Sequence, residues 1–415
     1  MGKTVAEKII ARASGRPEVN PGEIVWVVPD LTTAYDYLGL DYVTPDIEAL
    51  GATGLKNPEK IALFIDHHTP PRSEAEAATH VRTRLWSQKH GARLYEGLGI
   101  GHQVMIELGL ARPGMFVASH DTQVTGAGGI GALAIGALPL LEIYTRGKTW
   151  IKVPETIRYN ITGKLPKGVM ARDIMHMMVS EIGPDGALYK TMEFGGSTIA
   201  GMSIDERITM CNIANHPGAK AAIVNPDKKA IDYVRSRTSE PFEVVTSDPD
   251  ATYEKTLNFD VSKLEPYVAA LSEVYNCKPL REVEGTPVDV GYIGSCAGGR
   301  LEELRAAAAI LKGKRIHPSF KLYIVPTSQY IMKTAYKEGL METFIEAEAS
   351  VYPPTCDFCW GALGALAPGQ TAITTGTLNI MGRMGSNDSR IFLASAYSIA
   401  AAAIEGRIVD PRQYL

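Results

Sequence analysis

The strongest constraint on the fold is a regular alternation of strand-like and helix-like runs that begins at Thr286 of this 415-residue chain. Short apolar runs bounded by turn residues are typical of buried strands, and longer runs rich in Leu and Ala between them are typical of helices. The expected elements are a strand at 288–294, a helix at 301–311, a strand at 320–326, a helix at 329–347, an extended stretch at 350–354, a helix at 357–366 and a strand at 370–375. This order predicts βαβ units, a parallel sheet and therefore an α/β fold.

Two apolar runs nearer the start also end in polar residues. Residues 61–65 are followed by Asp66, His67 and His68, and residues 114–118 by Ser119, His120 and Asp121. Ligands of open α/β sheets bind at the carboxyl ends of the strands, so we expect both groups to lie at such an edge.

Changes in the pattern of apolar and polar residues along the chain predict three α/β domains. This pattern changes at Trp150, and residues 277–285 resemble a linker. The predicted domains are 1–150 with the acid–base residues, 151–285, and 286–415 with the chemically interesting cysteines.

The composition limits the classes of function. The chain is 45% hydrophobic and 21% charged, with a net charge of −4, as expected for a folded globular protein without a strong basic field. Nucleic-acid binding is therefore disfavoured. Five cysteines in an irregular pattern favour reduced thiols and a cytoplasmic location. Residues 123–141 carry no charge, but they are rich in glycine, so we interpret them as a packed loop and helix rather than a membrane span.

The glycines at 126–131 fit the pattern GxGxxG. A dinucleotide site also needs an acidic residue about 20 positions further on, and Glu142 comes too early. The glycines more plausibly let the backbone approach another element closely.

Cys356 and Cys359 form a CxxC pair that follows two prolines and is expected to open a helix, a position that lowers a thiol pKa. Alone, such a pair is compatible with a redox couple, half a zinc site, part of an iron–sulfur site or simple packing. Cys296 lies in a glycine-rich turn between a predicted strand and helix, so it presents a third thiol at the same sheet edge. Three thiolates are too few for a closed four-cysteine zinc site and suit a [4Fe–4S] cluster with one open iron. Cys211 and Cys277 are expected to be structural.

Several of the nine histidines occupy turn-like contexts. His67, His68, His102 and His120 are flanked by Gly or Asp, and His216 follows a predicted helix end. A single histidine is more often structural, but several beside strand ends favour acid–base chemistry.

These motifs together resemble the aconitase superfamily, most closely the large catalytic subunit of the 3-isopropylmalate dehydratase and homoaconitase type. The resemblance runs nearly end to end. It is carried by the start MGKTVAEKI, Asp66-His67-His68, Gly101-His102-Gln103, residues 207–212, residues 293–296, Cys356-Asp357-Phe358-Cys359, Gly382-Arg383 and residues 398–410.

The resemblance implies an iron–sulfur hydro-lyase with three α/β/α domains around a cluster held by Cys296, Cys356 and Cys359. The open iron of the family is a Lewis acid for loss of hydroxide from a small hydroxy acid. The family's swivelling domain is missing, which implies a separate small partner subunit. By the same resemblance, Asp66, His67 and His102 form the acid–base relay, and Arg383 is the retained basic group for the substrate.

The departures from the family fall on the residues expected to touch the substrate. Ser119-His120-Asp121 stands where Asp-Ser-His is usual, and His68 where Asn or Gln is common. His216 replaces a glutamate four residues after Asn212, and residues 297–299 lack the usual asparagine. Thr377-Leu378 replaces an Asn-Arg pair, which removes a bidentate carboxylate clamp.

These departures predict a substrate altered from isopropylmalate, with changed chemistry at the catalytic positions His120, Asp121 and His216. The expected substrate-binding positions are His68, Ser119, Asn212, Thr377, Leu378 and Arg383. Two alternatives remain open. One is an ordinary isopropylmalate or homoaconitate isomerase, and the other is a non-catalytic iron–sulfur sensor or binding protein.

Overall fold

The computed structural model describes residues 2–35, 43–52 and 54–415, and the chain divides into two compact units. Unit 1 comprises Met1–Gly97, Val104–Ile161 and Ala187–Phe259. Unit 2 comprises Leu98–Gln103, Thr162–Gly186 and Asp260–Leu415. Both units are assembled from separate stretches of chain, and the predicted three-domain division at 150 and 285 stays a prediction.

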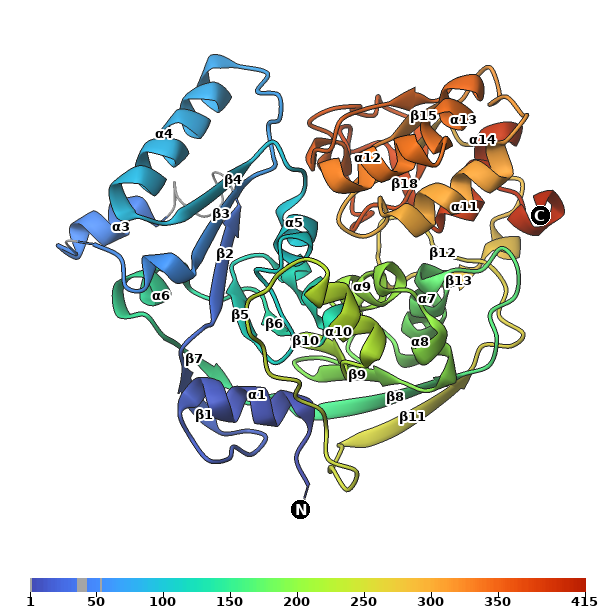
Figure 1. Ribbon diagram of the computed structural model, residues 1–415. Coiled ribbons are helices and arrows are strands. Elements are labelled where there is room, and N and C mark those ends of the chain that lie inside the picture. The colour runs from blue at the N-terminus through green and yellow to red at the C-terminus, as the bar shows by residue number, and fades with distance from the viewer. Residues whose placement is uncertain (1, 36–42, 53) are drawn as a thin grey trace. The chain divides into compact units, whose positions relative to one another are not determined.

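Unit 1 contains a five-stranded parallel sheet (Figure 1). Its spatial order is β4 (Arg93–Glu96), β3 (Ile61–Ile65), β2 (Leu31–Tyr35), β5 (Phe116–Ser119) and β6 (Leu133–Ile135). The two predicted apolar runs are β3 and β5, which both pair with β2. The helices of this part of the chain are α1 (Val5–Ser14), α3 (Thr44–Ala49), α4 (Glu74–His90) and α6 (Leu140–Arg146), with a 3-10 turn η1 (Pro58–Lys60) before β3.

A second sheet of unit 1 has the order β10 (Ala221–Val224), β9 (Thr191–Gly195), β8 (Thr156–Thr162) and β11 (Lys255–Asp260). The helices α8 (Ser197–Gly201), α9 (Ile204–Ile213) and α10 (Lys228–Arg235) accompany it, and β1 (Ile24–Val27) pairs with β7 (Thr149–Lys152) as a separate antiparallel ribbon.

The glycine-rich stretch is a 3-10 helix, η2 (Thr122–Ile130), packed closely against neighbouring backbone. A Cβ on Gly128 would lie 1.8 Å from the carbonyl oxygen of Ala222 in β10, and one on Gly129 would lie 2.6 Å from the amide nitrogen of Ile208 in α9. Only a residue without a side chain allows this approach. The interpretation of these glycines as a close backbone contact is confirmed.

Unit 2 contains a seven-stranded mixed sheet with the order β13 (Cys277–Pro279), β12 (Tyr267–Ala269), β18 (Arg390–Ala394), β17 (Thr371–Thr374), β14 (Val290–Ile293), β15 (Lys321–Ile324) and β16 (Ser350–Val351). The pairs from β18 to β16 are parallel, and β12 and β13 extend the sheet with antiparallel pairs. The interpretation of residues 277–285 as a linker is wrong, because Cys277–Pro279 is an edge strand and Leu280–Glu282 is a 3-10 turn, η3.

The helices of unit 2 include α7 (Ala171–Ile182), α11 (Leu301–Leu311), α12 (Gln329–Lys337), α13 (Leu340–Glu346) and α14 (Ala396–Glu405), and the chain ends with a 3-10 turn η5 (Pro411–Tyr414). The single helix expected at 329–347 is two helices, because Gly339 between them has φ 74°. The helix expected at 357–366 is only a 3-10 turn, η4 (Asp357–Trp360), which ends at Gly361 with φ 75°. A positive φ cannot continue a right-handed helix.

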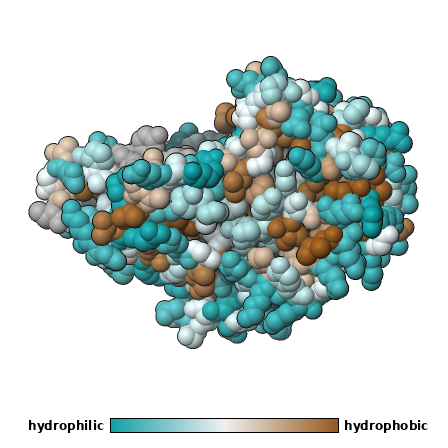
Figure 2. Space-filling model, turned by 90° about the horizontal axis from the view of Figure 1, so that it is seen from above, coloured by the Kyte–Doolittle hydropathy of each residue, from teal (hydrophilic) through white to brown (hydrophobic). Residues whose placement is uncertain are grey.

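The predicted α/β fold class is confirmed by these parallel sheets and their helices. The face of the molecule in Figure 2 is largely hydrophilic, with hydrophobic residues in small separate groups. Within the described ranges, no helix has the length and apolar character needed to cross a membrane.

Candidate functional site

The three cysteines of interest follow strands of the unit 2 sheet at their carboxyl ends. Cys296 follows β14, and Cys356 and Cys359 follow β16. Both strands run parallel to β15 between them, so their carboxyl ends share one edge of the sheet. The loop after β17, which pairs in parallel with β14, brings Thr377 to the same edge.

The turn that carries Cys296 is held by the end of β17. The amide of Gly294 donates to Oγ1 of Thr375 over 2.8 Å, and Oγ of Ser295 donates to the carbonyl oxygen of Thr375 over 3.0 Å. Ser295 has φ 67°, a conformation that costs energy for a residue with a side chain. A Cβ on Gly298 would lie 2.4 Å from Cβ of Thr375, so the family's asparagine would not fit at this point.

The thiols share a positively charged neighbourhood. Nη2 of Arg383 lies 3.9 Å from Sγ of Cys359, and Oγ1 of Thr377 lies 3.5 Å from the same sulfur. Burial opposes ionisation of Cys359, but the charge of Arg383 and hydrogen bonds from Thr377 outweigh it, so the pKa of this thiol is lowered. Burial likewise works against the charge of Arg383, but the thiolates of Cys359, Cys356 and Cys296 together raise its pKa. The negative charges of all three predicted ligands therefore act on the guanidinium of Arg383.

The buried donor groups of unit 2 without a hydrogen-bond partner in the described part of the chain include Nη1 of Arg172, Oη of Tyr292 and Nε of Arg383. The other terminal nitrogen of Arg172 donates to the carbonyl oxygens of Ala297 (3.1 Å) and Thr375 (2.6 Å). Burial lowers the pKa of Arg172 to about 10 against the opposing effect of nearby acidic groups and thiolates. Burial and then the three thiolates raise the pKa of Tyr292. Neither Arg172 nor Tyr292 belongs to a sequence motif that predicted a role for it.

The predicted acid–base residue His102 is buried and belongs to unit 2. Its segment is bound to the loop after β15: the amide of Ile100 donates to the carbonyl of Thr327 over 2.9 Å. His102 lies in α5 (Gly101–Glu107), and the next residue, Gln103, accepts a hydrogen bond of 2.8 Å from Nε of Arg300. Nη2 of Arg300 donates to the carbonyl oxygen of Cys296. A buried arginine therefore joins the element that carries His102 to the turn that carries Cys296.

Asp66 and His67 form a hydrogen-bonded pair at the end of β3 in unit 1. Nδ1 of His67 lies 2.8 Å from Oδ1 of Asp66, whose side chain is buried. Nε2 of His80, on α4, lies 3.2 Å from the carbonyl oxygen of His67. A buried carboxylate fixes the orientation of an imidazole and stabilises its protonated form, which is the arrangement that a proton-transfer pair requires.

His68, unlike His67, lies in a cluster of charged side chains. Its Nδ1 is 3.1 Å from Oε1 of Glu76 and 3.4 Å from Nη2 of Arg72. The hydrogen bond from Arg72 holds the pKa of Glu76 at about 2, with a smaller contribution from the charge of His68. The backbone of His68 has φ 52°, which changes the direction of the chain after β3.

The polar groups after β5 support local structure. Oγ of Ser119 donates to the carbonyl of Thr33 over 3.2 Å and accepts from the amide of Asp121 over 3.1 Å. Asp121 caps η2 by accepting from the amide of Gln123 over 2.8 Å, and Nδ2 of Asn212 donates to the carbonyl of Gln123 over 3.1 Å. These contacts give the three side chains a folding role, and their predicted roles towards a substrate stay predictions.

The remaining predicted residues are placed as follows. The ring of His120 lies 5.6 Å from the ring of Tyr35, centroid to centroid. His216 is buried just after α9, and Leu378 is half-buried beside Thr377. The roles predicted for these residues stay predictions.

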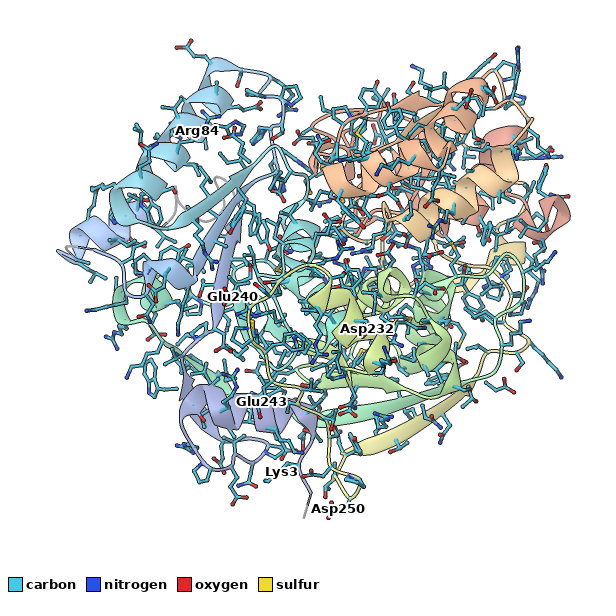
Figure 3. All side chains as sticks on the ribbon, viewed as in Figure 1. Lys3, Arg84, Asp232, Glu240, Glu243 and Asp250 are labelled. Carbon is cyan, nitrogen blue, oxygen red and sulfur yellow. The ribbon has the colours of Figure 1, made fainter. Side chains whose placement is uncertain are left out.

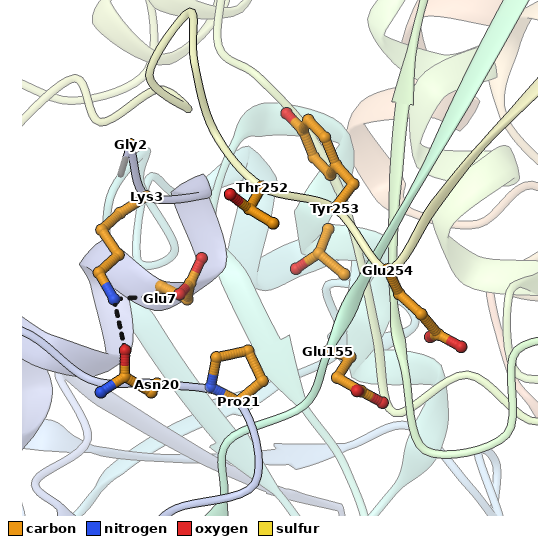
Figure 4. Close-up of a pocket in the computed structure, with 10 residues that line it drawn as sticks. Gly2, Lys3, Glu7, Asn20, Pro21, Glu155, Thr252, Tyr253 and Glu254 are labelled. Carbon is orange, nitrogen blue, oxygen red and sulfur yellow. Dashed lines mark hydrogen bonds and ion pairs between the residues drawn. The ribbon is translucent and has the colours of Figure 1, made fainter.

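A cavity of about 250 Å³ in unit 1 contains none of the predicted site residues (Figure 4). Nζ of Lys3 donates to Oδ1 of Asn20 over 2.8 Å, and Lys190 pairs with both Glu155 and Glu254. The charged side chains that line this cavity are thus compensated within the protein. The lining consists of Gly2, Lys3, Glu7, Asn20, Pro21, Glu155, Thr156, Thr252, Tyr253 and Glu254.

Comparison with solved structures shows the fold alone. The chain matches the crystal structure of aconitase X from Thermococcus kodakaraensis, in its holo form, with a TM-score of 0.50 and 12% sequence identity. The match covers 94% of this chain and 89% of the other.

Comparison of sequences gives much closer relatives. The chain is 39% identical over 420 residues to a 3-isopropylmalate dehydratase large subunit of Methanopyrus kandleri, covering 100% of both chains. It is 40% identical to the corresponding subunit of Heliobacterium modesticaldum, again covering 100% of both. It is also 39% identical to a probable methanogen homoaconitase large subunit of Methanothermobacter thermautotrophicus, covering 99% of this chain and 97% of the relative.

The model of the aconitase (aconitate hydratase) family matches residues 62–283 and 271–406. Together with the full-length relatives, this match confirms the resemblance inferred from the cysteine, histidine and arginine motifs. The chain belongs to the aconitase family and is an enzyme of the hydro-lyase type.

Proposed function

We propose that this chain is the large subunit of an iron–sulfur dehydratase that acts on a small hydroxy acid, with Cys296, Cys356 and Cys359 as the ligands of a [4Fe–4S] cluster. The observation that carries the proposal is the grouping of these three thiols around Arg383 at one sheet edge. The full-length similarity to large subunits of 3-isopropylmalate dehydratases supports the reaction type.

The donor set of unit 2 fits such a cluster better than it fits a single metal ion. Among the residues that the structure describes, no three His, Cys, Asp or Glu side chains are grouped closely enough to hold one ion. A four-iron cluster is instead bound by one thiolate at each of several separate corners. Its sulfide atoms accept hydrogen bonds, and the unpartnered Nη1 of Arg172, Oη of Tyr292 and Nε of Arg383 are donors beside the thiols. A buried cation such as Arg172 is also stabilised by the net negative charge of a cluster and its thiolates nearby.

When bound, the cluster supplies an open, Lewis-acidic iron that assists loss of a hydroxyl group. The chain's own residues perform the remaining tasks. Arg383 pairs with one substrate carboxylate, as a guanidinium does through two parallel hydrogen bonds. His67 takes or gives a proton at its other ring nitrogen, Nε2, while Asp66 holds Nδ1 at 2.8 Å. His102, held through Gln103 and Arg300, is the second acid–base group.

The substrate is proposed to differ from isopropylmalate because Leu378 stands where the family has an arginine. The position follows Thr377, whose hydroxyl is 3.5 Å from Sγ of Cys359, so it lies close to the proposed cluster. A carboxylate left unpaired against an apolar wall costs about 2–5 kcal/mol, or tens to thousands of fold in affinity. We therefore expect a substrate with an apolar or neutral group facing Leu378.

The names of the relatives favour a second candidate, an ordinary isopropylmalate or homoaconitate isomerase in which the substitutions are tolerated. A non-catalytic iron–sulfur protein is a third candidate, but the Asp66–His67 pair is a feature that it would not need. A small partner subunit, with the swivelling domain, and a cytoplasmic location complete the proposal. The partner is supported by the relatives, which are named as large subunits of 3-isopropylmalate dehydratases.

The cluster is tested by metal analysis of anaerobically prepared protein. We expect about four irons per chain and broad visible absorption from thiolate-bound iron. Cys296→Ser, Cys356→Ser and Cys359→Ser should each reduce the iron content strongly, whereas Cys211→Ser and Cys277→Ser should not. Unchanged iron in all three ligand variants, or stoichiometric zinc without iron, would refute the assignment.

The substrate is tested with the chain and its small subunit assembled. Isopropylmalate, homocitrate, citrate and smaller hydroxy acids are compared by kcat/KM. Leu378→Arg should shift the ranking towards acids with an additional carboxylate. A ranking that is unaffected by this change, or efficient turnover of isopropylmalate by the unaltered chain, would favour the ordinary isomerase.

A further inference from the structure

A cavity of about 360 Å³ lies in unit 1 at the amino ends of the strands of the five-stranded sheet. Asp30 directly precedes β2, Lys60 precedes β3, and Gly114 and Met115 precede β5. The strands are parallel, so this is the edge opposite to the one that carries Asp66 and Ser119. The remaining lining comes from α1, from the turn before β5 and from the segment after α10: Arg12, Arg112, Pro113, Pro241, Phe242 and Glu243.

The cavity holds two cationic groups, Lys60 and Arg112, that form no ion pair with a carboxylate of the described residues. Lys60 is half-buried and forms no ion pair with any described residue. Arg112 donates from Nη1 to the carbonyl of Gly109 over 3.1 Å, but its buried Nε has no hydrogen-bond partner among the described residues. A buried guanidinium N–H that is shielded from water and unpaired costs free energy unless a ligand supplies the acceptor.

The acidic residues of the cavity do not neutralise these two cations. Asp30 is engaged by Arg12, at 3.1 Å through Nη1 and 2.5 Å through Nη2, and accepts a further hydrogen bond from the amide of Phe116 at 2.7 Å. Glu243, on the segment beside α1, is exposed and forms no ion pair with a described residue (Figure 3). With Arg12 and Asp30 paired, Lys60 and Arg112 exceed Glu243 by one positive charge.

This arrangement differs from that of the cavity in Figure 4, where Lys3 pairs with Glu7 and the carboxylates of Glu155 and Glu254 pair with Lys190 outside the lining. The cavity also has apolar walls, formed by Met115, Phe242 and two prolines. Its volume lies at the small end of the range for metabolite sites. A guanidinium and an ammonium that line one such pocket are typical of recognition of a carboxylate or phosphate group.

We propose that this cavity binds a small anionic metabolite, with its oxyanion group, a carboxylate or a phosphate, held between Lys60 and Arg112 and its organic part against Phe242 and Met115. The site is separate from the catalytic edge of the same sheet, and it does not depend on the cluster or the substrate proposed above. Glu243 at the rim weakens binding through its negative charge.

The test is calorimetric titration of the full chain at constant ionic strength, set with chloride, using inorganic phosphate and succinate as probes. Either probe is expected to bind at one site per chain and to raise the Tm in proportion to its occupancy. Phosphate binding much tighter than succinate identifies a phosphate ligand, and the reverse order identifies a carboxylate; both results support the site. Absence of binding by both probes overturns the proposal.

Variants make the test specific. Lys60→Gln and Arg112→Gln should each weaken binding about tenfold or more, as expected for loss of a charge-assisted hydrogen bond. Glu243→Gln should strengthen it severalfold. Lys255→Gln, which removes an exposed lysine of β11 outside the cavity, is the matched control for net charge and should leave affinity unchanged.

Equal affinities in all four variants would show that binding, if any, occurs elsewhere, and would overturn the proposal. Lys60 is half-buried and forms no ion pair with a described residue, so Lys60→Gln decides the question even if Arg112→Gln is unstable. The opposite signs expected for Lys60→Gln and Glu243→Gln exclude a general change in stability as the cause.

Discussion

Replacement of Arg300 by alanine should destabilise unit 2 and release the segment that carries His102. Arg300 is completely buried, and it donates to Oε1 of Gln103 over 2.8 Å and to the carbonyl oxygen of Cys296. A hydrogen bond from a charged donor contributes about 1.5–3 kcal/mol, and Arg300 makes both of these. We expect Arg300→Ala to lower the free energy of unfolding by about 3–5 kcal/mol on these grounds.

The matched control is Arg305→Ala, a change of the same type on α11. The side chain of Arg305 is 44% exposed and pairs with Glu338 at 2.6 Å and Glu302 at 3.1 Å. Exposed pairs of this kind contribute about 0–1 kcal/mol. Arg300→Lys keeps the charge but not the fork of donors, so its loss of stability should fall between the two.

The measurements are equilibrium urea unfolding and amide hydrogen exchange. Exchange should accelerate in Arg300→Ala at Ile100 and Gln103, whose amides are hydrogen-bonded within and next to this segment. A double-mutant cycle of Arg300→Ala with Gln103→Ala should give a coupling energy of about 1–2 kcal/mol. The reasoning fails if Arg300→Ala and Arg305→Ala have equal unfolding free energies and exchange in residues 98–103 is unchanged.

Three further changes give predictions of defined sign. Burial raises the pKa of Asp173 to about 7, above the value of about 3.9 in an unfolded chain, so the folded state binds this proton more tightly. Relative to Asp173→Asn, the unaltered protein should therefore lose unfolding free energy as the pH rises from about 4 to about 7, by at most about 1.4 kcal/mol per pH unit. Above about pH 7 the difference in unfolding free energy should stay constant. A difference that does not change between about pH 4 and about pH 7 in urea titrations would contradict this prediction. Gly128→Ala should destabilise unit 1 by at least about 1–3 kcal/mol, because its Cβ would lie 1.8 Å from the carbonyl oxygen of Ala222. Gly126→Ala, whose Cβ would have its nearest neighbour at 3.4 Å, should destabilise it much less. Equal Tm values for the two variants would contradict the close packing. Glu193→Ala should cost about 3–5 kcal/mol in urea unfolding, because this fully buried carboxylate accepts from four side chains; a loss below about 1 kcal/mol would show that their hydrogen bonds are replaced.

Local patterns predicted many elements of the fold because their cause is local. The helix at 301–311 and the strand at 61–65 have the predicted bounds, since each has an uninterrupted apolar period. The stretch at 329–347 contains the same period on both sides of Gly339, so periodicity alone could not reveal the break. Cys277–Pro279 was misread because a three-residue edge strand has too short a pattern to distinguish it from a linker.

The candidate site could be predicted only in part, for a physical reason. The cysteines and histidines were found because their side chains have distinctive chemistry and follow strands at recognisable turns. Arg172 and Arg300 were missed because an arginine in a sequence looks like a surface residue, and only the packing shows that both are buried and donate to backbone oxygens. Asp121 was predicted as catalytic, and no pattern in the sequence indicated that its carboxylate caps η2.

The interleaving of the two units has a consequence for synthesis on the ribosome. Leu98–Gln103 is made early, yet the rest of unit 2, Thr162–Gly186 and Asp260–Leu415, is made later. Thr327, which accepts the amide hydrogen bond of Ile100, is made more than 200 residues later. At about 5–20 residues per second, the nascent segment waits about 10–45 s for this partner. During that interval its apolar residues are exposed, so a chaperone that shields this stretch should raise the yield of folded protein more than one that acts after release.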